Sequence, residues 1–167
     1  PESEYFFPKP LIEVLGKPMI ELIVKNLQKN FQDSVFTFVI DKEDALKHSL
    51  GKLLKLIGGE TTRVVERHGE TSGALCSCLL AVDELELDEP LLVCNGDMLI
   101  SDNITKRIDE IKVNNCIAGV LTFESLHPRW SYVEPNDERF VAQVYEKNVV
   151  SNKAIAGIYY FETAMAF

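Results

Sequence analysis

Asp97 combines a residue type and a position that can do chemistry. The apolar run Leu91–Cys94 has the composition of a buried strand, and Asn95-Gly96-Asp97 follows it directly. Because Gly96 has no side chain, a ligand can approach the Asp97 carboxylate closely. Mg²⁺ prefers oxygen ligands and is usually held by one or two carboxylates together with substrate phosphates. The stretch therefore fits a metal site at a strand end, and a simple surface turn is the alternative.

Two further stretches have residues suited to a phosphate or a nucleobase. Lys9 lies between Pro8 and Pro10, which stiffen the backbone and lower the entropy cost of holding its ammonium group, a compact charge, in place. Gly69–Gly73 lies between a predicted strand ending at Glu66 and a predicted helix. Backbone N–H groups at such a junction can meet an anion or the edge of a base. Taken alone, the two stretches are also explained as a solvated lysine and a helix cap.

The residues around these stretches alternate between strand and helix patterns. Their order argues for an α/β fold, a Rossmann-like doubly wound and mostly parallel mixed sheet, in which ligands sit beyond the carboxyl ends of the strands. No linker interrupts residues 1–167, which are expected to form a single domain. Strands are expected at 34–40, 61–66, 90–95, 115–123 and 154–161, helices at 20–27, 46–57, 72–85 and 104–111, and a hairpin at 130–146 with its turn at Asn136-Asp137.

The composition excludes several classes of function. The chain has 167 residues with 46% hydrophobic and 26% charged content, which is typical of one globular domain. Its net charge of −9 argues against binding to nucleic-acid backbones. No apolar run is long enough to span a membrane, and a cytoplasmic location is expected. The four cysteines, Cys76, Cys78, Cys94 and Cys116, have no zinc or redox spacing and are interpreted as small buried thiols.

The order of the motifs is more specific than any one of them. Proline-flanked Lys9, then Gly16-Lys17-Pro18 before a helix, then Thr71-Ser72-Gly73-Ala74, then Asn95-Gly96-Asp97 resembles the sugar-1-phosphate nucleotidylyltransferases, also called nucleotide-sugar pyrophosphorylases. The resemblance extends from about Phe7 to Phe161, and the tail "YEKNVVSNKAIAGIYYF" is similar to the family's Glu-Lys hairpin end and Ala-Gly-Ile-Tyr strand. It implies a GT-A-like nucleotidyltransferase fold with a small β-hairpin insertion near the sugar site.

The resemblance also implies an activity and the residues that carry it. A sugar 1-phosphate oxygen would attack the α-phosphate of an NTP, pyrophosphate would leave, and the product would be a nucleotide-sugar, such as a polysaccharide precursor. Lys9 and Asp97 would be the catalytic residues, Asp97 as the ligand of Mg²⁺. The residues implied in nucleotide binding are Lys9, Glu66, Gly69, Thr71, Gly73, Asn95 and Gly96, and those implied in sugar-phosphate binding are Ser131, Glu146, Lys147, Ala156 and Gly157. The NTP, the sugar and formation of a homo-oligomer stay open.

The sequence departs from this family at three places. The family's N-terminal strand and Gly-rich triphosphate loop have no match, since the first glycine is Gly16, and no second metal aspartate follows Phe161. Glu70 stands where many relatives have glycine, which leaves the base open. The residues before Lys9 resemble the connection from the Gly-rich loop, so we expect a preceding segment. The alternatives are transfer to another small phosphate such as phosphocholine, a GT-A glycosyltransferase, and a non-catalytic nucleotide or sugar-phosphate-binding module.

Overall fold

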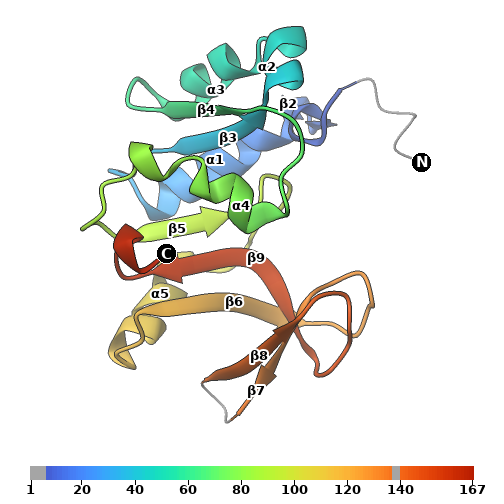
Figure 1. The fold of residues 1–167 in the computed structure, drawn as a ribbon, viewed down its shortest axis with the longest axis vertical. Helices are drawn as coiled ribbons and strands as arrows, with labels where there is room; N and C mark the ends of the chain where they lie inside the picture. Colours follow the sequence, from blue (N-terminus) through green and yellow to red (C-terminus); the bar gives the residue numbers. More distant parts are fainter. Residues whose placement is uncertain (1–6, 137–139) are drawn as a thin grey trace. The chain divides into compact units, whose positions relative to one another are not determined.

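The computed structural model describes residues 7–136 and 140–167, so the second residue of the expected turn, Asp137, lies outside them. The chain forms two compact units (Figure 1). The first unit comprises Pro1–Leu87 and Leu99–Asp102, and the second comprises Asp88–Met98 and Asn103–Phe167.

The first unit is built on two parallel strands. β3 and β4 pair in register from Thr37 opposite Arg63 to Asp41 opposite Arg67, so their carboxyl ends coincide. The helix expected at 46–57 is in fact two helices, because Ser49 adopts a left-handed backbone with φ of 51°. The elements are η2 (Lys9–Leu11), β1 (Glu13–Val14), β2 (Lys17–Pro18), α1 (Met19–Asn30), β3 (Thr37–Asp41), α2 (Lys42–His48), α3 (Leu50–Gly58), β4 (Arg63–Arg67), α4 (Ala74–Leu79) and η3 (Val82–Glu84).

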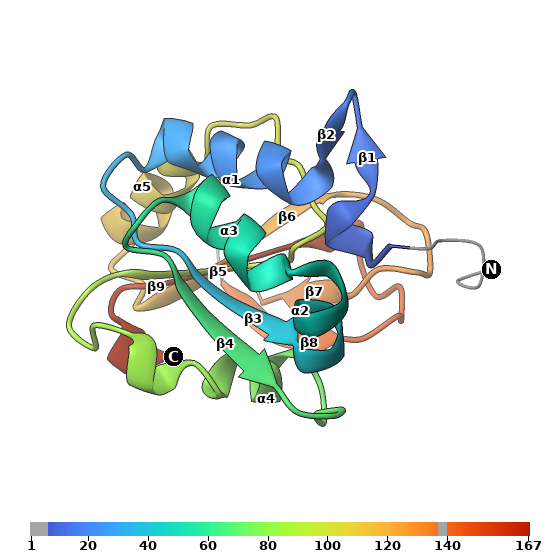
Figure 2. The ribbon, with the colours of Figure 1, turned by 90° about the horizontal axis from the view of Figure 1, so that it is seen from above.

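The core of the first unit lies between two helices and this strand pair. The apolar positions of α1 repeat at helical spacing, which brings Ile20 and Val24 to one face, and α3 contributes Leu50 and Leu54. All four side chains are buried, and strand residues such as Phe38 pack against them. Figure 2 shows α1 and α3 side by side along the strands. Helix packing on one face therefore holds β3 and β4 and fixes where their ends lie.

The second unit is a sheet of antiparallel pairs centred on β9. β9 pairs with β5, β6 and β7, and β7 pairs with β8 as the expected hairpin. Asn103 caps α5, since its side chain accepts a hydrogen bond from the Lys106 N–H at 3.0 Å. The elements are β5 (Leu91–Cys94), α5 (Ile104–Val113), β6 (Ala118–Glu124), β7 (Tyr132–Pro135), β8 (Val141–Tyr145), β9 (Lys153–Phe161) and η4 (Ala164–Ala166).

Three expectations need comment. The α/β class with a mixed sheet is confirmed, but among the described strand pairs only β3 and β4 run parallel, so parallel pairs do not predominate. The helix expected at 72–85 is limited to α4 and the short η3.

Cys76 is exposed, which corrects its interpretation as a buried thiol, and the other three cysteines are partly buried. No helix of residues 7–136 and 140–167 is both long and apolar enough to cross a membrane.

Leu54→Ala should destabilise the first unit strongly. Its side chain is 1% exposed within the core, and truncating a buried leucine costs about 2–5 kcal/mol through lost burial and the cavity left behind. Leu56→Ala is the matched control, since Leu56 lies on the same helix and is 84% exposed. Urea unfolding of both variants measures the difference, and similar losses would contradict this description of the core.

Candidate functional site

A cavity in the first unit gathers residues from two of the predicted stretches. It has a volume of about 560 Å³, and its lining includes Pro8 and Pro10 together with Glu70, Thr71 and Gly73. This volume is within the range of small-molecule sites, roughly 300–1,000 Å³. Other lining residues are Val39, Ile40, Asp41, Asp44, Leu50, Arg67 and Ser77. The cavity therefore lies at the carboxyl ends of β3 and β4, where α/β folds bind ligands.

Lys9 is held beside this cavity by its backbone. It begins the η2 turn, in which Leu11 N–H donates to the Pro8 carbonyl at 2.9 Å and Ile12 N–H donates to the Lys9 carbonyl at 3.1 Å. Pro8 and Pro10 line the cavity, whereas the exposed Lys9 lies between them and is not itself a lining residue. Glu66 and Gly69, predicted to bind nucleotide, are also absent from the lining.

An ion pair that the sequence analysis missed forms one wall of the cavity. Arg67 Nη2 lies 3.2 Å from Asp41 Oδ2, and the same carboxylate accepts the Glu43 N–H through Oδ1 at 2.8 Å. The two residues end the paired strands in register. A charged residue ending each of two adjacent strands was the available signal, but it becomes informative only when the register is known. Such a pair fixes the Arg67 guanidinium at the cavity.

The turn before α4 is fixed by hydroxyl groups. Thr71 Oγ1 lies 2.6 Å from Ser77 Oγ, and it also donates to the Gly73 carbonyl at 3.2 Å. Gly73 has φ of +121° and nothing within 4 Å of where a Cβ would stand. The turn is thus held in shape while its surface at Gly73 stays open, which suits close approach of a ligand to the backbone.

In the second unit, β5 and β7 lie along the same side of β9 and diverge at Gly157. β5 ends with Cys94 opposite Ile158, and β7 begins with Tyr132 opposite Ala154. At this point the Asn95 N–H donates to the Gly157 carbonyl at 2.9 Å. Gly157 has φ of +68°, and an added Cβ would lie 2.5 Å from Asn95 Nδ2. The Asn95 side chain therefore lies directly against the backbone of β9, which only glycine permits.

Asp97 lies in the exposed turn immediately after these contacts. An exposed carboxylate beside a fixed strand end has the oxygen chemistry that Mg²⁺ accepts, with the remaining positions left to water and phosphate. Among the residues described, no cluster of three or more His, Cys, Asp or Glu could by itself hold a metal. Asp97 can supply one carboxylate ligand of the oxygen type that Mg²⁺ accepts.

Most of the predicted sugar-phosphate residues come from one end of the β7–β8 hairpin and the adjoining part of β9. Tyr132 pairs with Tyr145, so Ser131 precedes β7 at the end where Glu146 and Lys147 follow β8. The Ser131 carbonyl accepts the Ile155 N–H at 2.8 Å. Ala156 and Gly157 of β9 are buried in the same region of the sheet.

Glu146 and Lys147 are exposed and paired with each other. Lys147 Nζ lies 3.6 Å from Glu146 Oε1, with side chains that are 70% and 79% exposed. Lys147 has φ of 51°, a left-handed conformation that is uncommon for residues other than glycine and is often found at functional sites. The pair presents one carboxylate and one ammonium group to solvent, which can bind a hydroxyl and a phosphate respectively.

Several solved structures share the fold of this chain. The nucleoside-diphosphate-sugar pyrophosphorylase of Vibrio cholerae RC9 superposes with a TM-score of 0.75 over 97% of this chain and 68% of that chain, at 20% identity. UDP-glucose pyrophosphorylase complexed with UDP-glucose superposes with a TM-score of 0.69 over 97% of this chain and 70% of that chain, at 16% identity. HddC from Yersinia pseudotuberculosis complexed with GMP-PN superposes with a TM-score of 0.67 over 93% of this chain and 68% of that chain, at 17% identity. These likenesses show the fold alone.

The chain belongs to the nucleotidyl transferase family, whose model it matches over residues 5–167. The expected resemblance to sugar-1-phosphate nucleotidylyltransferases is thereby confirmed. The chain is also similar to the bifunctional protein GlmU of Methanocaldococcus jannaschii, at 26% identity over 157 residues. Its identity to the GlmU of Methanococcus aeolicus is 24% over 159 residues. Each comparison covers 93% of this chain and 35% of the relative, so the chain spans about a third of their length.

Gly157→Ala should disturb the strand end that carries Asn95. The left-handed backbone and the collision with Asn95 together cost about 2–4 kcal/mol. Gly69→Ala is the control, because Gly69 has φ of +72° and nothing within 4 Å of an added Cβ. Thermal unfolding should show the larger loss for Gly157→Ala, and adding Asn95→Ala should recover part of it. Equal losses would mean that the contact with Asn95 has no energetic consequence.

The thiols should react in the order of their exposure. Burial raises the pKa of the Cys94 thiol to about 12, so at pH 8 only about one in ten thousand of these groups is a thiolate. The pKa of Cys78 is also raised by burial, whereas Cys76 is exposed. Timed iodoacetamide labelling followed by peptide mass spectrometry should find Cys76 modified first. Equally fast labelling of Cys94 would contradict its burial in β5.

Proposed function

We propose that this protein transfers a nucleotidyl group from an NTP to a sugar 1-phosphate, giving a nucleotide-sugar and pyrophosphate. The observation that carries the proposal is the exposed Asp97 carboxylate in the turn after β5, two residues beyond Asn95, whose N–H is bound to the Gly157 carbonyl. The chain that presents this carboxylate belongs to the nucleotidyl transferase family. We also propose that the protein acts in the cytoplasm, in the biosynthesis of nucleotide-sugars for polysaccharides.

The cavity of the first unit supports the nucleotide part of the proposal. It is lined by both prolines that flank Lys9 and by the Thr71–Gly73 turn. A lysine ammonium is a point charge that suits a phosphate, and the prolines limit the entropy lost when it is held there. Lys9 would contact the phosphates and neutralise charge that develops on them, while the turn would border the base. Glu66, Gly69, Asn95 and Gly96 stay proposed nucleotide contacts from the family resemblance.

The hairpin end of the second unit supports the acceptor part. Glu146 and Lys147 present opposite charges to solvent, which suits a molecule that has both hydroxyl groups and a phosphate. Ser131, Ala156 and Gly157 would contribute backbone beside the sugar. Of these, the Ser131 carbonyl already accepts the Ile155 N–H at 2.8 Å, so this part of the backbone is fixed before a ligand binds.

The chemistry requires positioning and charge neutralisation more than a reactive side chain. An oxygen of the acceptor phosphate forms a bond to the α-phosphorus, and the bond from that phosphorus to the pyrophosphate oxygen breaks with its electron pair leaving on pyrophosphate. A bound Mg²⁺ would supply Lewis-acid stabilisation of the phosphate oxygens, and Asp97 would hold it. Burial of the partly exposed Cys94 side chain, next to Asn95, raises the pKa of its thiol to about 12, so it is no nucleophile at neutral pH.

Asp97→Ala should abolish metal-dependent turnover. Loss of the carboxylate removes the proposed protein ligand of the metal, and we expect a fall of at least about 100-fold in pyrophosphate release. The assay uses a panel of NTPs with hexose 1-phosphates and Mg²⁺, and phosphocholine as a competing acceptor. Asp109→Ala, which removes an equal charge from an exposed position on α5, should retain full activity.

Three outcomes would contradict the proposal. Unchanged turnover in Asp97→Ala would exclude its metal role. Turnover with phosphocholine alone would replace the sugar acceptor. Transfer of sugar from a nucleotide-sugar without release of pyrophosphate would indicate a glycosyltransferase.

A further inference from the structure

Arg129 and Trp130 form a fixed stack at the start of the β7–β8 hairpin. The Arg129 guanidinium carbon lies 4.1 Å from the centroid of the Trp130 ring, well within the range of a cation–π interaction. Phe123 of β6 meets the same indole in an edge-to-face arrangement, with centroids 5.4 Å apart and planes at 86°. Phe123 thus packs against the Trp130 indole, and the Arg129 guanidinium stacks on the same indole.

The loop that carries the stack is fixed by its own hydrogen bonds. The His127 carbonyl accepts the Trp130 N–H at 3.2 Å and the Tyr132 hydroxyl at 2.8 Å. The Arg129 N–H donates to His127 Nδ1 at 3.2 Å. Tyr132 is completely buried, so it anchors the loop to the sheet. A loop held in this way loses little entropy when it binds a ligand.

The Arg129 guanidinium has no carboxylate partner among the residues described. The guanidinium contacts the Trp130 ring. Arg107, for comparison, pairs with Glu110 at 3.3 Å. Stacking uses the face of a guanidinium and leaves the N–H groups at its edge able to donate to a phosphate in a bidentate manner. In a chain with a net charge of −9, an exposed and unpaired cation held in one place points to an anionic ligand.

The position of the stack indicates which anion. Trp130 is followed by Ser131, whose carbonyl is bound to Ile155 N–H of β9. Because Tyr132 opens β7 opposite Tyr145, the last residue of β8, Arg129 lies toward the same end of the hairpin as Lys147. Lys147 is already paired with Glu146, whereas no carboxylate in the described part of the chain pairs with Arg129.

We propose that Arg129, oriented by Trp130, binds the phosphate of the phosphorylated acceptor as a second cation beside Lys147. This inference rests on the proposed function for the identity of the acceptor. Arg129 then selects phosphorylated over neutral sugars at this hairpin end, and Trp130 acts as a positioning residue that keeps the guanidinium plane in place.

The test uses the single tryptophan of the chain as an internal reporter. Glucose, mannose and N-acetylglucosamine 1-phosphates are titrated into the protein while Trp130 emission is followed, with calorimetry as a second measure of Kd. At least one of them should saturate the signal, and glucose should not. Arg129→Gln should raise Kd about tenfold, and Arg129→Lys should give an intermediate value because it keeps the charge and loses the planar fork.

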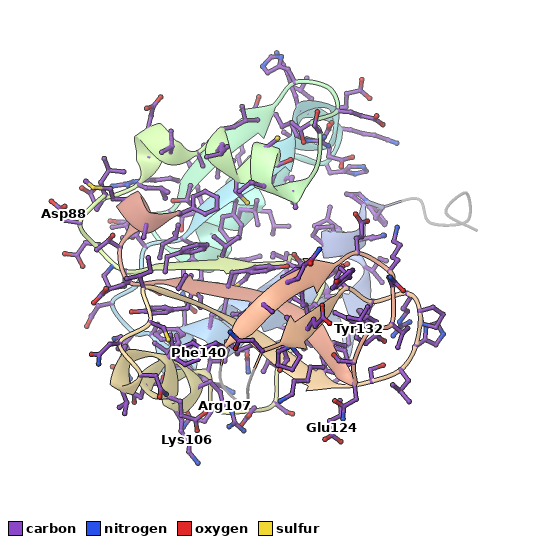
Figure 3. All side chains as sticks on the ribbon, turned by 60° about the horizontal axis from the view of Figure 1, so that its bottom comes forward. Asp88, Lys106, Arg107, Glu124, Tyr132 and Phe140 are labelled. Carbon is purple, nitrogen blue, oxygen red and sulfur yellow. The ribbon has the colours of Figure 1, made fainter. Side chains whose placement is uncertain are left out.

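Arg107→Gln is the matched control, because it removes the same charge from α5 of the same unit. Arg107 lies on α5, apart from Tyr132 in Figure 3, and its variant should bind within twofold of wild type. In turnover, Arg129→Gln should raise KM for the acceptor and leave KM for the NTP unchanged.

The inference is overturned if Arg129→Gln binds as tightly as wild type, if neutral glucose binds as tightly as the phosphates, or if no sugar phosphate binds. Arg129-dependent binding without any release of pyrophosphate would support the phosphate contact and overturn the proposed reaction. Pyrophosphate release that is unchanged in Arg129→Gln would support the proposed reaction and overturn the phosphate contact. The two failures are therefore distinguishable.

Discussion

The second unit depends on hydrogen bonding of three strands to β9. β5, β6 and β7 all pair with this strand, and β9 therefore determines where the other strands can begin and end. Gly157 marks the place along β9 where β5 stops pairing and the pairing with β7 lies beyond. Its left-handed backbone coincides with an irregular pairing to β6 between Val120 and Thr122, as is typical of a bulge. The change of partner from β5 to β7 along β9 occurs at this irregularity.

The same constraint explains why the second unit's candidate ligand-binding residues lie just outside strands, except for Ala156 and Gly157 within β9. Asn95–Asp97 follows β5 because β5 can extend no further along β9 once Gly157 is reached. Ser131 precedes β7, and Glu146 follows β8, because the hairpin pairing begins with Tyr132 opposite Tyr145. Backbone pairing thus fixes the Cα positions, and the exposed side chains remain available to a ligand. Rigid strands that support exposed ends are the usual way to position binding groups without burying their charges.

The sequence was sufficient for most of the elements and for the β7–β8 hairpin, but not for the other strand pairings. Helical spacing identified α1, because one buried face repeats regardless of what covers it. The break at Ser49 was not visible, since a left-handed serine has no sequence signal comparable with glycine. β5 reads as an apolar run whether its neighbour is parallel or antiparallel, so its antiparallel pairing with β9 could not be inferred.

The candidate residues of the site divide in the same way, into those that the sequence suggests and those that only the fold brings together. Single residues with a recognisable motif, Lys9 and Asp97, could be chosen from the sequence. The Asp41–Arg67 pair depends on strand register, and the stack of Arg129 on Trp130 depends on a loop conformation fixed by His127 and Tyr132. Neither can be read from spacing, because adjacent residues in a loop can point in any direction until hydrogen bonds select one.

Exposure separates the charged side chains that would bind ligands from the residues that hold the fold. Asp97 and Arg129 are exposed, and an exposed charge contributes little to stability, typically below about 1 kcal/mol. Their removal should therefore change binding or turnover without unfolding the protein. Gly157 is different, since it is buried and its backbone conformation is needed for both the sheet and the placement of Asn95. A loss of activity at Gly157 would report on structure, whereas a loss at Asp97 or Arg129 would report on the ligand.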